Sequence, residues 1–200
     1  MVPWKIVVLS GASGSGKTTC IRVLESFAPA VRFCQLPSVT TRAPRPGDEP
    51  WYEYVDLDTF RKMKSDGKFL WIEAVHGNLY GTTKDAFETA LAYGDCLLAS
   101  LTPHDIPTIA MRGLDYGVPL EEMLFLYIRH PGDEVLRKRL EARGDAKDVI
   151  ERRIADCANW DGLAKDAKLV FPRQVKLDVT FIENDTSEET FAGKVRTLFT

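Results

Sequence analysis

The sequence predicts an α/β fold in which a parallel sheet is flanked by helices. Three observations support this prediction. Apolar runs typical of buried strands alternate with helix-like runs along most of the 200 residues. A glycine-rich segment, residues 11–16, connects the first strand-like run to the first helix-like run. The stretch from Thr40 to Thr82 breaks this alternation, which indicates a smaller lobe inserted into the core.

The strands of the core are predicted from short apolar runs. The first, Lys5–Ser10, is apolar and β-branched, which suits a strand that is buried on both faces. The other predicted core strands are Asp95–Leu101, Met123–Arg129 and Val179–Glu183.

The helices are predicted from apolar spacing and from end signals. A helix begins at Lys17 because Ile21, Leu24 and Phe27 follow at helical spacing. Pro131 suits the first turn of a later helix, and Gly144 suits its end. The predicted helices are Lys17–Phe27, Thr83–Ala92, Glu134–Ala142, Ala146–Cys157 and Glu188–Leu198.

The inserted stretch has a composition of its own. It begins with a proline-rich loop, Pro44–Pro50. Short aromatic strands are predicted around Tyr52–Val55 and Phe69–Val75, and a small helix near Asp58–Lys64.

Residues 11–18 read Gly-Ala-Ser-Gly-Ser-Gly-Lys-Thr, a complete GxxxxGK[ST] phosphate-binding loop. Backbone N–H groups of such a loop surround phosphate oxygens, and the following helix N-terminus adds positive potential. Lys17 is expected to reach the β- and γ-phosphates, and the Thr18 hydroxyl to ligate Mg²⁺. The predicted ATP-binding residues of this segment are Gly11, Ala12, Ser13, Gly14, Ser15, Gly16, Lys17, Thr18 and Thr19.

Composition restricts the possible functions. A net charge of −3 argues against a general nucleic-acid binder, which is usually basic. No apolar stretch is long enough to cross a bilayer, and we expect no signal peptide before the first strand. The four cysteines form no zinc-binding pattern, so a reduced, cytoplasmic protein is expected.

Two groups of arginines suggest further phosphate contacts. Arg42 and Arg45 lie in the stiff loop of the inserted lobe, and Arg139 and Arg143 stand four residues apart on one helix face. Arg153 lies on the next predicted helix. Phosphoryl transfer needs such cations around the migrating group. The alternatives are a solvated loop, in which Arg42 and Arg45 pair with Asp48 and Glu49, and a helix whose arginines face solvent.

These motifs together resemble the guanylate kinase family. The resemblance is carried by Gly11–Thr19, by Ser38–Gly47, by His76–Thr82 and by Leu136–Gly144, which occur in the family's order. It implies a P-loop nucleoside-monophosphate kinase with ATP and Mg²⁺ as cofactors. It implies a core of residues 1–37, 83–133 and 166–200, an acceptor-binding lobe of residues 38–82 and a helical lid of residues 134–165.

The resemblance also implies roles for particular residues. Lys17 and the lid arginines Arg139, Arg143 and Arg153 would be catalytic, and Asn184 would lie near the adenine of ATP. The acceptor phosphate would be held by Arg42, Arg45, Tyr52 and Tyr80, and the guanine would be contacted by Ser38 and Thr82.

The chain departs from the family pattern where the base is recognised. Trp71 stands where the family usually has a glutamate, and Ala99 and Leu101 stand where it tends to have aspartates. Glu73 lies two residues along the same predicted strand and so faces the same side as Trp71. Glu73 could therefore accept hydrogen bonds from guanine, with Trp71 stacking on the base; alternatively, Trp71 and Leu101 close the pocket against guanine.

Three functions are compatible with the sequence. The first is transfer of the ATP γ-phosphate to GMP or dGMP. The second is the same chemistry with another or modified nucleotide, or a sugar phosphate, as acceptor. The third is a non-catalytic binding module, which the complete phosphate loop disfavours. The expected partners are small nucleotides, with no nucleic acid and no membrane, and the expected assembly is a monomer or a homodimer.

Overall fold

The structure is a computed structural model that describes residues 3–44, 51–166, 169–170, 175–184 and 187–199. Contacts divide the chain into two compact units. The first comprises Met1–Val31 and Ser100–Thr200, and the second comprises Arg32–Ala99. Residues 134–165 fall in the first unit and residues 32–37 and 83–99 in the second. The three-part division into core, acceptor lobe and lid stays a prediction.

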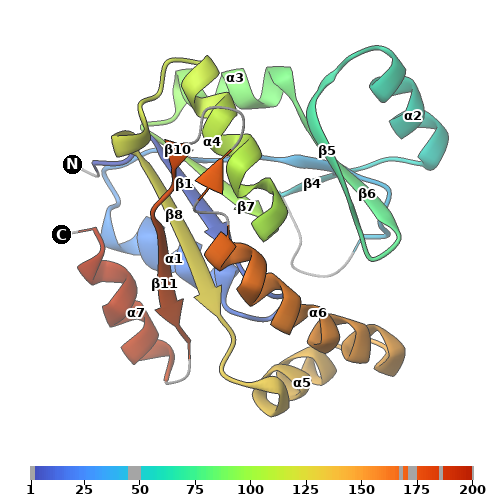
Figure 1. The fold of residues 1–200 in the computed structure, drawn as a ribbon, viewed down its shortest axis with the longest axis vertical. Helices are drawn as coiled ribbons and strands as arrows, with labels where there is room; N and C mark the ends of the chain where they lie inside the picture. Colours follow the sequence, from blue (N-terminus) through green and yellow to red (C-terminus); the bar gives the residue numbers. More distant parts are fainter. Residues whose placement is uncertain (1–2, 45–50, 167–168, 171–174, 185–186, 200) are drawn as a thin grey trace. The chain divides into compact units, whose positions relative to one another are not determined.

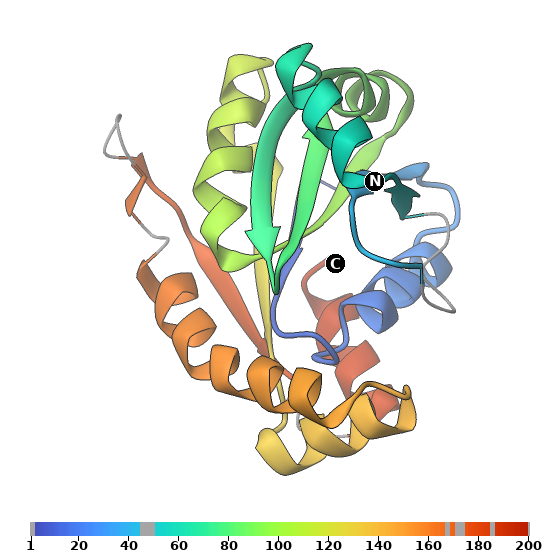
Figure 2. The same ribbon diagram turned by 90° about the vertical axis from the view of Figure 1, so that its right-hand side faces the viewer.

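The first unit is built on parallel strands (Figure 1). β1 (Ile6–Ser10) pairs with β8 (Met123–Arg129), and β8 pairs with β11 (Val179–Glu183), all in parallel. All five residues of β1 are buried, because helices cover both faces. Figure 2 shows α4 (Ile106–Asp115) on one face of these strands and α1 (Lys17–Phe27) with α7 (Glu188–Thr197) on the other.

Two helices follow the carboxyl end of β8 in the first unit (Figure 1). They are α5 (Asp133–Ala142) and α6 (Lys147–Asp166), which pack against each other. Leu136 and Leu140 of α5 are fully buried in a cluster with Ile150 and Cys157 of α6 and with Ala12 of the glycine-rich loop. This cluster fixes the two helices to the loop. The unit also contains the short helices η1 (Pro103–Asp105) and η2 (Leu120–Glu122), and the antiparallel strands β9 (Leu169–Val170) and β10 (Val175–Lys176).

The second unit contains a four-stranded sheet with the order β4-β3-β6-β5. Its strands are β3 (Ser38–Thr40), β4 (Tyr52–Tyr54), β5 (Phe69–Val75) and β6 (Asn78–Thr83). The unit also holds α2 (Leu57–Ser65), α3 (Lys84–Tyr93) and the parallel strands β2 (Phe33–Gln35) and β7 (Cys96–Leu101). The last two residues of β7 belong to the first unit.

A β-bulge in β5 changes the face of this sheet to which its side chains point. Phe69 pairs with Thr83 of β6, but Trp71 pairs with Thr82, so the register shifts between them. Residues two apart on a regular strand share a face, so the bulge places Phe69 and Trp71 on opposite faces. Phe69 stacks on Phe60 of α2 with a centroid distance of 4.6 Å, whereas Trp71 meets Phe87 of α3 edge-on at 6.1 Å.

Most of the sequence-predicted elements are confirmed with small shifts at their ends. Predicted strand Met123–Arg129 and predicted helix Lys17–Phe27 have the observed bounds. The prediction that a helix ends at Cys157 was wrong, because α6 continues to Asp166. The sequence reading also missed α4, which carries Pro107 in its first turn and Gly113 inside it. Gly113 lies in close packing, since a Cβ there would collide with the end of the Met123 side chain and lie 3.1 Å from Ile6 Cδ1 of β1.

Candidate active site

The glycine-rich loop runs from the end of β1 to the start of α1. Gly11, Gly14 and Gly16 have φ angles of 138°, 86° and 112°, which side-chain-bearing residues rarely adopt. The N–H of Ser15 donates to the carbonyl oxygen of Ala12 at 3.1 Å, which closes the turn. The three glycines therefore allow the sharp turn of this loop. Helix α1 begins directly after it, at Lys17.

Lys17 lies within this loop. Its Nζ donates to the carbonyl oxygens of Gly11 and Ala12 at 2.6 and 2.9 Å. Burial is the largest cause, and the positive charges of Arg143 and Arg153 act in the same direction, so that the pKa of Lys17 is lowered to about 8. A group of opposite charge, such as a phosphate, would favour the protonated lysine.

Asn184, at the end of β11, supports the loop from another direction. Its side-chain amide donates to the Ser15 carbonyl oxygen at 2.5 Å, and the residue is 5% exposed. A Cβ on Gly16 would collide with this amide, so glycine is required there by packing as well as by its φ angle. Asn184 thus has a structural contact with the loop, and its expected position near adenine stays a prediction.

The three arginines expected in the lid all lie against the loop. Arg139 Nη1 donates to the Gly14 carbonyl oxygen at 3.1 Å. Arg143 and Arg153 donate to the Ser13 hydroxyl oxygen at 3.2 and 3.1 Å. They come from α5, from the turn that follows it and from α6, so the fold brings together cations that are up to 14 residues apart in sequence. Such a cluster can surround phosphate oxygens.

Thr18 is the expected magnesium ligand. It is exposed in the first turn of α1. Within the ranges that the structure describes, no group of three or more His, Cys, Asp or Glu side chains could hold a metal ion. A single hydroxyl still fits Mg²⁺, which usually takes one or two protein ligands and completes its shell with substrate phosphates and water.

The expected acceptor residues lie in the second unit, on one face of the four-stranded sheet. The register pairs Thr40 with both Tyr54 and Tyr80, and Tyr80 with Glu73. Directly paired residues point to the same face, and so do residues two apart on a regular strand. The face therefore carries, in two adjacent rows, Ser38, Thr40, Tyr52, Tyr54, Trp71, Glu73, Tyr80 and Thr82. We call this set the hydroxyl face.

Arg42 lies at the hydroxyl face. Its guanidinium carbon is 5.0 Å from the ring centre of Tyr52 and 5.7 Å from that of Tyr54. Arg42 is 8% exposed, and its Nη1 also donates to the Ala43 carbonyl oxygen at 3.0 Å. Stacking on aromatic rings fixes a guanidinium plane at little entropic cost. The sequence reading missed Tyr54, although its spacing of two from Tyr52 is a signal for a shared strand face. Arg45, Asp48 and Glu49 lie outside the described residues.

Trp71 and Glu73 differ in their surroundings. Trp71 is 9% exposed and packs on Phe87, so its indole belongs to the interior of the unit. Glu73 is partly exposed and lies opposite Tyr80. Among the described residues, the four strands carry two carboxylates, Glu73 and Glu53. Glu53 pairs with Val39 and therefore faces the opposite side of the sheet from Glu73.

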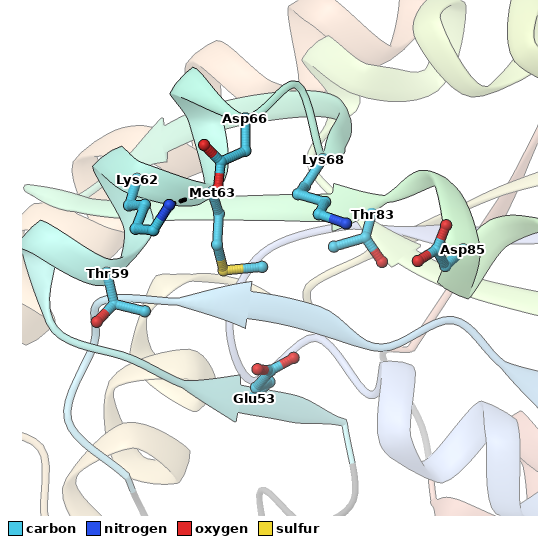
Figure 3. A pocket seen from close by; sticks show the side chains of 8 residues that line it. All are labelled: Glu53, Thr59, Lys62, Met63, Asp66, Lys68, Thr83 and Asp85. Carbon is cyan, nitrogen blue, oxygen red and sulfur yellow. Dashed lines mark hydrogen bonds and ion pairs between the residues drawn. The ribbon is translucent and has the colours of Figure 1, made fainter.

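A hollow of about 360 Å³ lies on that opposite side of the sheet (Figure 3). Side chains of α2 and the sheet line it, including Glu53, Lys62, Met63 and Thr83. Its lining includes no residue of the hydroxyl face. The hollow is therefore separate from the expected acceptor residues.

Comparisons with known proteins point to one family. The family model described as guanylate kinase matches residues 4–160. Guanylate kinase of Thiobacillus denitrificans is 35% identical over 160 residues, which cover 78% of this chain and 72% of that protein. Guanylate kinase of Sphingopyxis alaskensis is 38% identical over 164 residues, covering 78% and 71%.

A solved structure shares the fold. The crystal structure of guanylate kinase from Anaplasma phagocytophilum superposes with a TM-score of 0.62 at 23% identity, covering 100% of this chain and 87% of that one.

In the described part of the chain, no helix is both long enough and apolar enough to cross a membrane.

Proposed function

The chain belongs to the guanylate kinase family, and from this membership we propose that it transfers the γ-phosphoryl group of ATP to GMP or dGMP. It is then an ATP-dependent nucleoside-monophosphate kinase that produces the nucleoside diphosphate. The observation that carries the proposal is the convergence of Lys17 and the arginines of the lid on the glycine-rich loop. A phosphate-binding loop bordered by four cations is suited to a triphosphate and to the charge of its transfer.

The proposed reaction is a direct in-line transfer. An anionic oxygen of the acceptor phosphate forms a bond to the γ-phosphorus, and the bond from that phosphorus to the β,γ-bridging oxygen breaks. The electron pair leaves with ADP, so the protein needs no covalent nucleophile and no general base. Lys17, Arg139, Arg143 and Arg153 stabilise the charge on the transferring group. Mg²⁺, held by Thr18 and the nucleotide phosphates, would neutralise further charge on those phosphates.

The hydroxyl face is proposed as the acceptor site. Arg42 has a planar donor group that fits two phosphate oxygens, and Tyr52 and Tyr80 add hydroxyl donors beside it. Arg45 is proposed to act with Arg42. Ser38 and Thr82 are proposed to contact the guanine.

Glu73 is proposed to recognise the guanine base. Guanine presents N1–H and N2–H donors, which a carboxylate accepts as a pair. Glu73 is the carboxylate that the four described strands place on the hydroxyl face. Trp71 borders the site, and its packing on Phe87 supports a role in shaping the pocket rather than in stacking on the base.

The test is a nucleotide panel. We expect ADP release from ATP–Mg²⁺ to be fastest with GMP or dGMP among ribo- and deoxynucleoside monophosphates. Lys17→Ala should lower kcat by about a thousandfold or more, because the developing charge loses its nearest cation. Preference for another acceptor would refute the guanine assignment, and a Lys17→Ala protein with normal kcat would refute the site.

Glu73→Gln tests the base-reading role separately. An amide presents both a donor and an acceptor, so it cannot accept from both guanine donors, and the preference for GMP over AMP should fall by about tenfold or more. Glu53→Gln, on the opposite sheet face, is the matched control and should leave this preference unchanged. A Glu73→Gln protein with unchanged preference would remove Glu73 from the acceptor site.

Location and assembly are also proposed. We propose a cytoplasmic enzyme, which the four free cysteines support. A monomer or homodimer is expected, and light scattering after gel filtration measures which one forms.

A further inference from the structure

Two arginines of the lid share one carboxylate. Arg143 and Arg153 both donate to Oδ2 of Asp145, and the distance from Arg153 Nη1 is 2.7 Å. The Asp145 side chain is only 7% exposed, and that of Arg153 only 6%. The Arg153–Asp145 pair is therefore buried and charge-assisted, and it differs from an ion pair at the surface, which contributes little, whereas the Arg143 side chain is 39% exposed.

The backbone holds Asp145 in place. Asp145 lies between α5 and α6, and its N–H donates to the Leu140 carbonyl oxygen at 3.1 Å. Gly144 precedes it with a φ angle of 83°, a conformation that suits glycine at the end of a helix. The carboxylate is thus attached to the end of α5, while Arg153 comes from α6.

The same two guanidinium groups contact the glycine-rich loop. Both donate to Ser13 Oγ, so each bridges Asp145 and the loop. Their charges lie close enough to Lys17 to lower its pKa, which shows that several cations crowd this region. One carboxylate offsets part of their repulsion and gives both guanidinium groups a fixed acceptor.

We propose that Asp145 is a positioning residue for phosphoryl transfer, which holds Arg143 and Arg153 against Ser13 so that they meet the transferring group without rearrangement. The inference rests on the proposed kinase function. Asp145 acts through the arginines and touches no substrate. Preorganised charges stabilise a transition state more than charges that must first be oriented.

The proposal predicts two effects of opposite sign. Loss of Asp145 should slow transfer, because the two guanidinium groups lose their fixed acceptor. It should also strengthen ATP binding, because a negative charge beside the triphosphate is removed. A residue needed only for packing of the lid would instead weaken ATP binding and slow transfer together.

The experiment compares Asp145→Ala and Asp145→Asn with Asp148→Asn. Asp148 is a suitable control because it lies on α6, its side chain is 74% exposed, and its substitution changes the charge equally. For Asp145→Ala we expect kcat to fall by about tenfold or more and the Kd for ATP to fall about two- to fivefold. Asp145→Asn retains one acceptor oxygen, so its kcat should lie between that of Asp145→Ala and that of the wild type. Asp148→Asn should stay within about twofold of wild type in both quantities.

A second comparison tests whether Asp145 acts through an arginine. In an Arg153→Ala background, Asp145→Ala should cause a markedly smaller loss of kcat than in the wild type, because one of its two partners is already absent. Thermal unfolding of every variant checks the fold, and the near-isosteric Asp145→Asn protein decides the outcome if Asp145→Ala does not fold.

Distinct outcomes overturn the inference and the proposed function. An Asp145→Asn protein with normal kcat, weaker ATP binding in parallel with slower transfer, or equal losses in both backgrounds would overturn the role of Asp145. Absence of transfer by the wild type to any nucleoside monophosphate would instead refute the kinase function.

Discussion

Lys17 is held by carbonyl oxygens and surrounded by like charges. Its pKa of about 8 follows from burial first and from Arg143 and Arg153 second. Because the folded-state pKa lies below the ordinary value of 10.5, the native protein loses this proton at lower pH than the unfolded chain does. The positive charge that a phosphate requires is therefore present at neutral pH and is lost as the pH rises through about 8.

This titration predicts pH-dependent ATP binding. Between pH 7.5 and 9.5 the affinity of the wild type for ATP should fall, by at most about tenfold for each pH unit above the pKa of Lys17. Calorimetric titration in buffers of different ionisation enthalpy would also detect proton uptake on binding. Lys17→Arg is the control, because its guanidinium stays charged over this range. Parallel pH profiles for the two proteins would contradict the lowered pKa.

Arg42 is fixed by aromatic stacking, and this contact leads to a second prediction. Arg42→Ala should raise the KM for GMP by about tenfold or more while changing the KM for ATP little, because Arg42 is proposed to contact the acceptor and not ATP. Arg42→Lys should recover only part of the loss, since an ammonium group lacks the planar donor fork.

Arg61→Ala is the matched control for Arg42. Arg61 is in the same unit, on α2, and its side chain is 66% exposed beside Asp58. It should leave both KM values unchanged. An Arg42→Ala protein with a normal KM for GMP would remove Arg42 from the acceptor site.

Among the elements, the four-stranded sheet depends on small residues and on a register shift. Gly81 of β6 lies beneath the Phe60–Phe69 stack, and a Cβ there would come within 2.6 Å of Phe69. Aromatic rings packed this closely leave no space for a methyl group. The stack holds α2 against one face of the sheet and leaves the hydroxyl face on the other.

Gly81→Ala should therefore destabilise this unit by about 1–3 kcal/mol through overpacking. Chemical denaturation followed by tryptophan fluorescence measures this change, because Trp71 lies in the same unit. Gly193→Ala, in α7, is the control: a Cβ there meets nothing within 4 Å, so alanine should be neutral or stabilising by up to about 1 kcal/mol. Equal effects of the two substitutions would contradict the packing argument.

At the scale of the whole molecule, the four cysteines report on both units. Cys20, Cys96 and Cys157 are buried, whereas Cys34 is partly exposed, and all four are free. Burial raises the pKa of Cys20 and of Cys157 to about 12, so both remain thiols at pH 8.

We therefore expect Ellman's reagent to modify one thiol of the native protein quickly at pH 8, and four in denaturant. Cys34→Ser should remove the fast reaction and leave the slow ones. Rapid reaction of two or more thiols in the native protein would show that a buried cysteine is accessible.

Much of the first unit could be predicted because its signals are local. The strand Ile6–Ser10 follows from an apolar run, and α1 follows from apolar spacing after the loop. Helix α4 was missed because Pro107 and Gly113 are poor helix formers, and its close packing on Ile6 becomes visible only in three dimensions.

The site divides in the same way. The phosphate loop could be read from the chain alone, since glycines with positive φ, a lysine and a hydroxyl at fixed spacing specify how a short backbone segment binds phosphate. Two features became visible in three dimensions. They are Asp145, which accepts from the same two arginines that donate to Ser13, and the bulge that places Phe69 and Trp71 on opposite sheet faces. Local geometry is encoded by neighbouring residues, whereas the pairing of strands and contacts such as those of Arg143 and Arg153 with Ser13 depend on how all the elements pack.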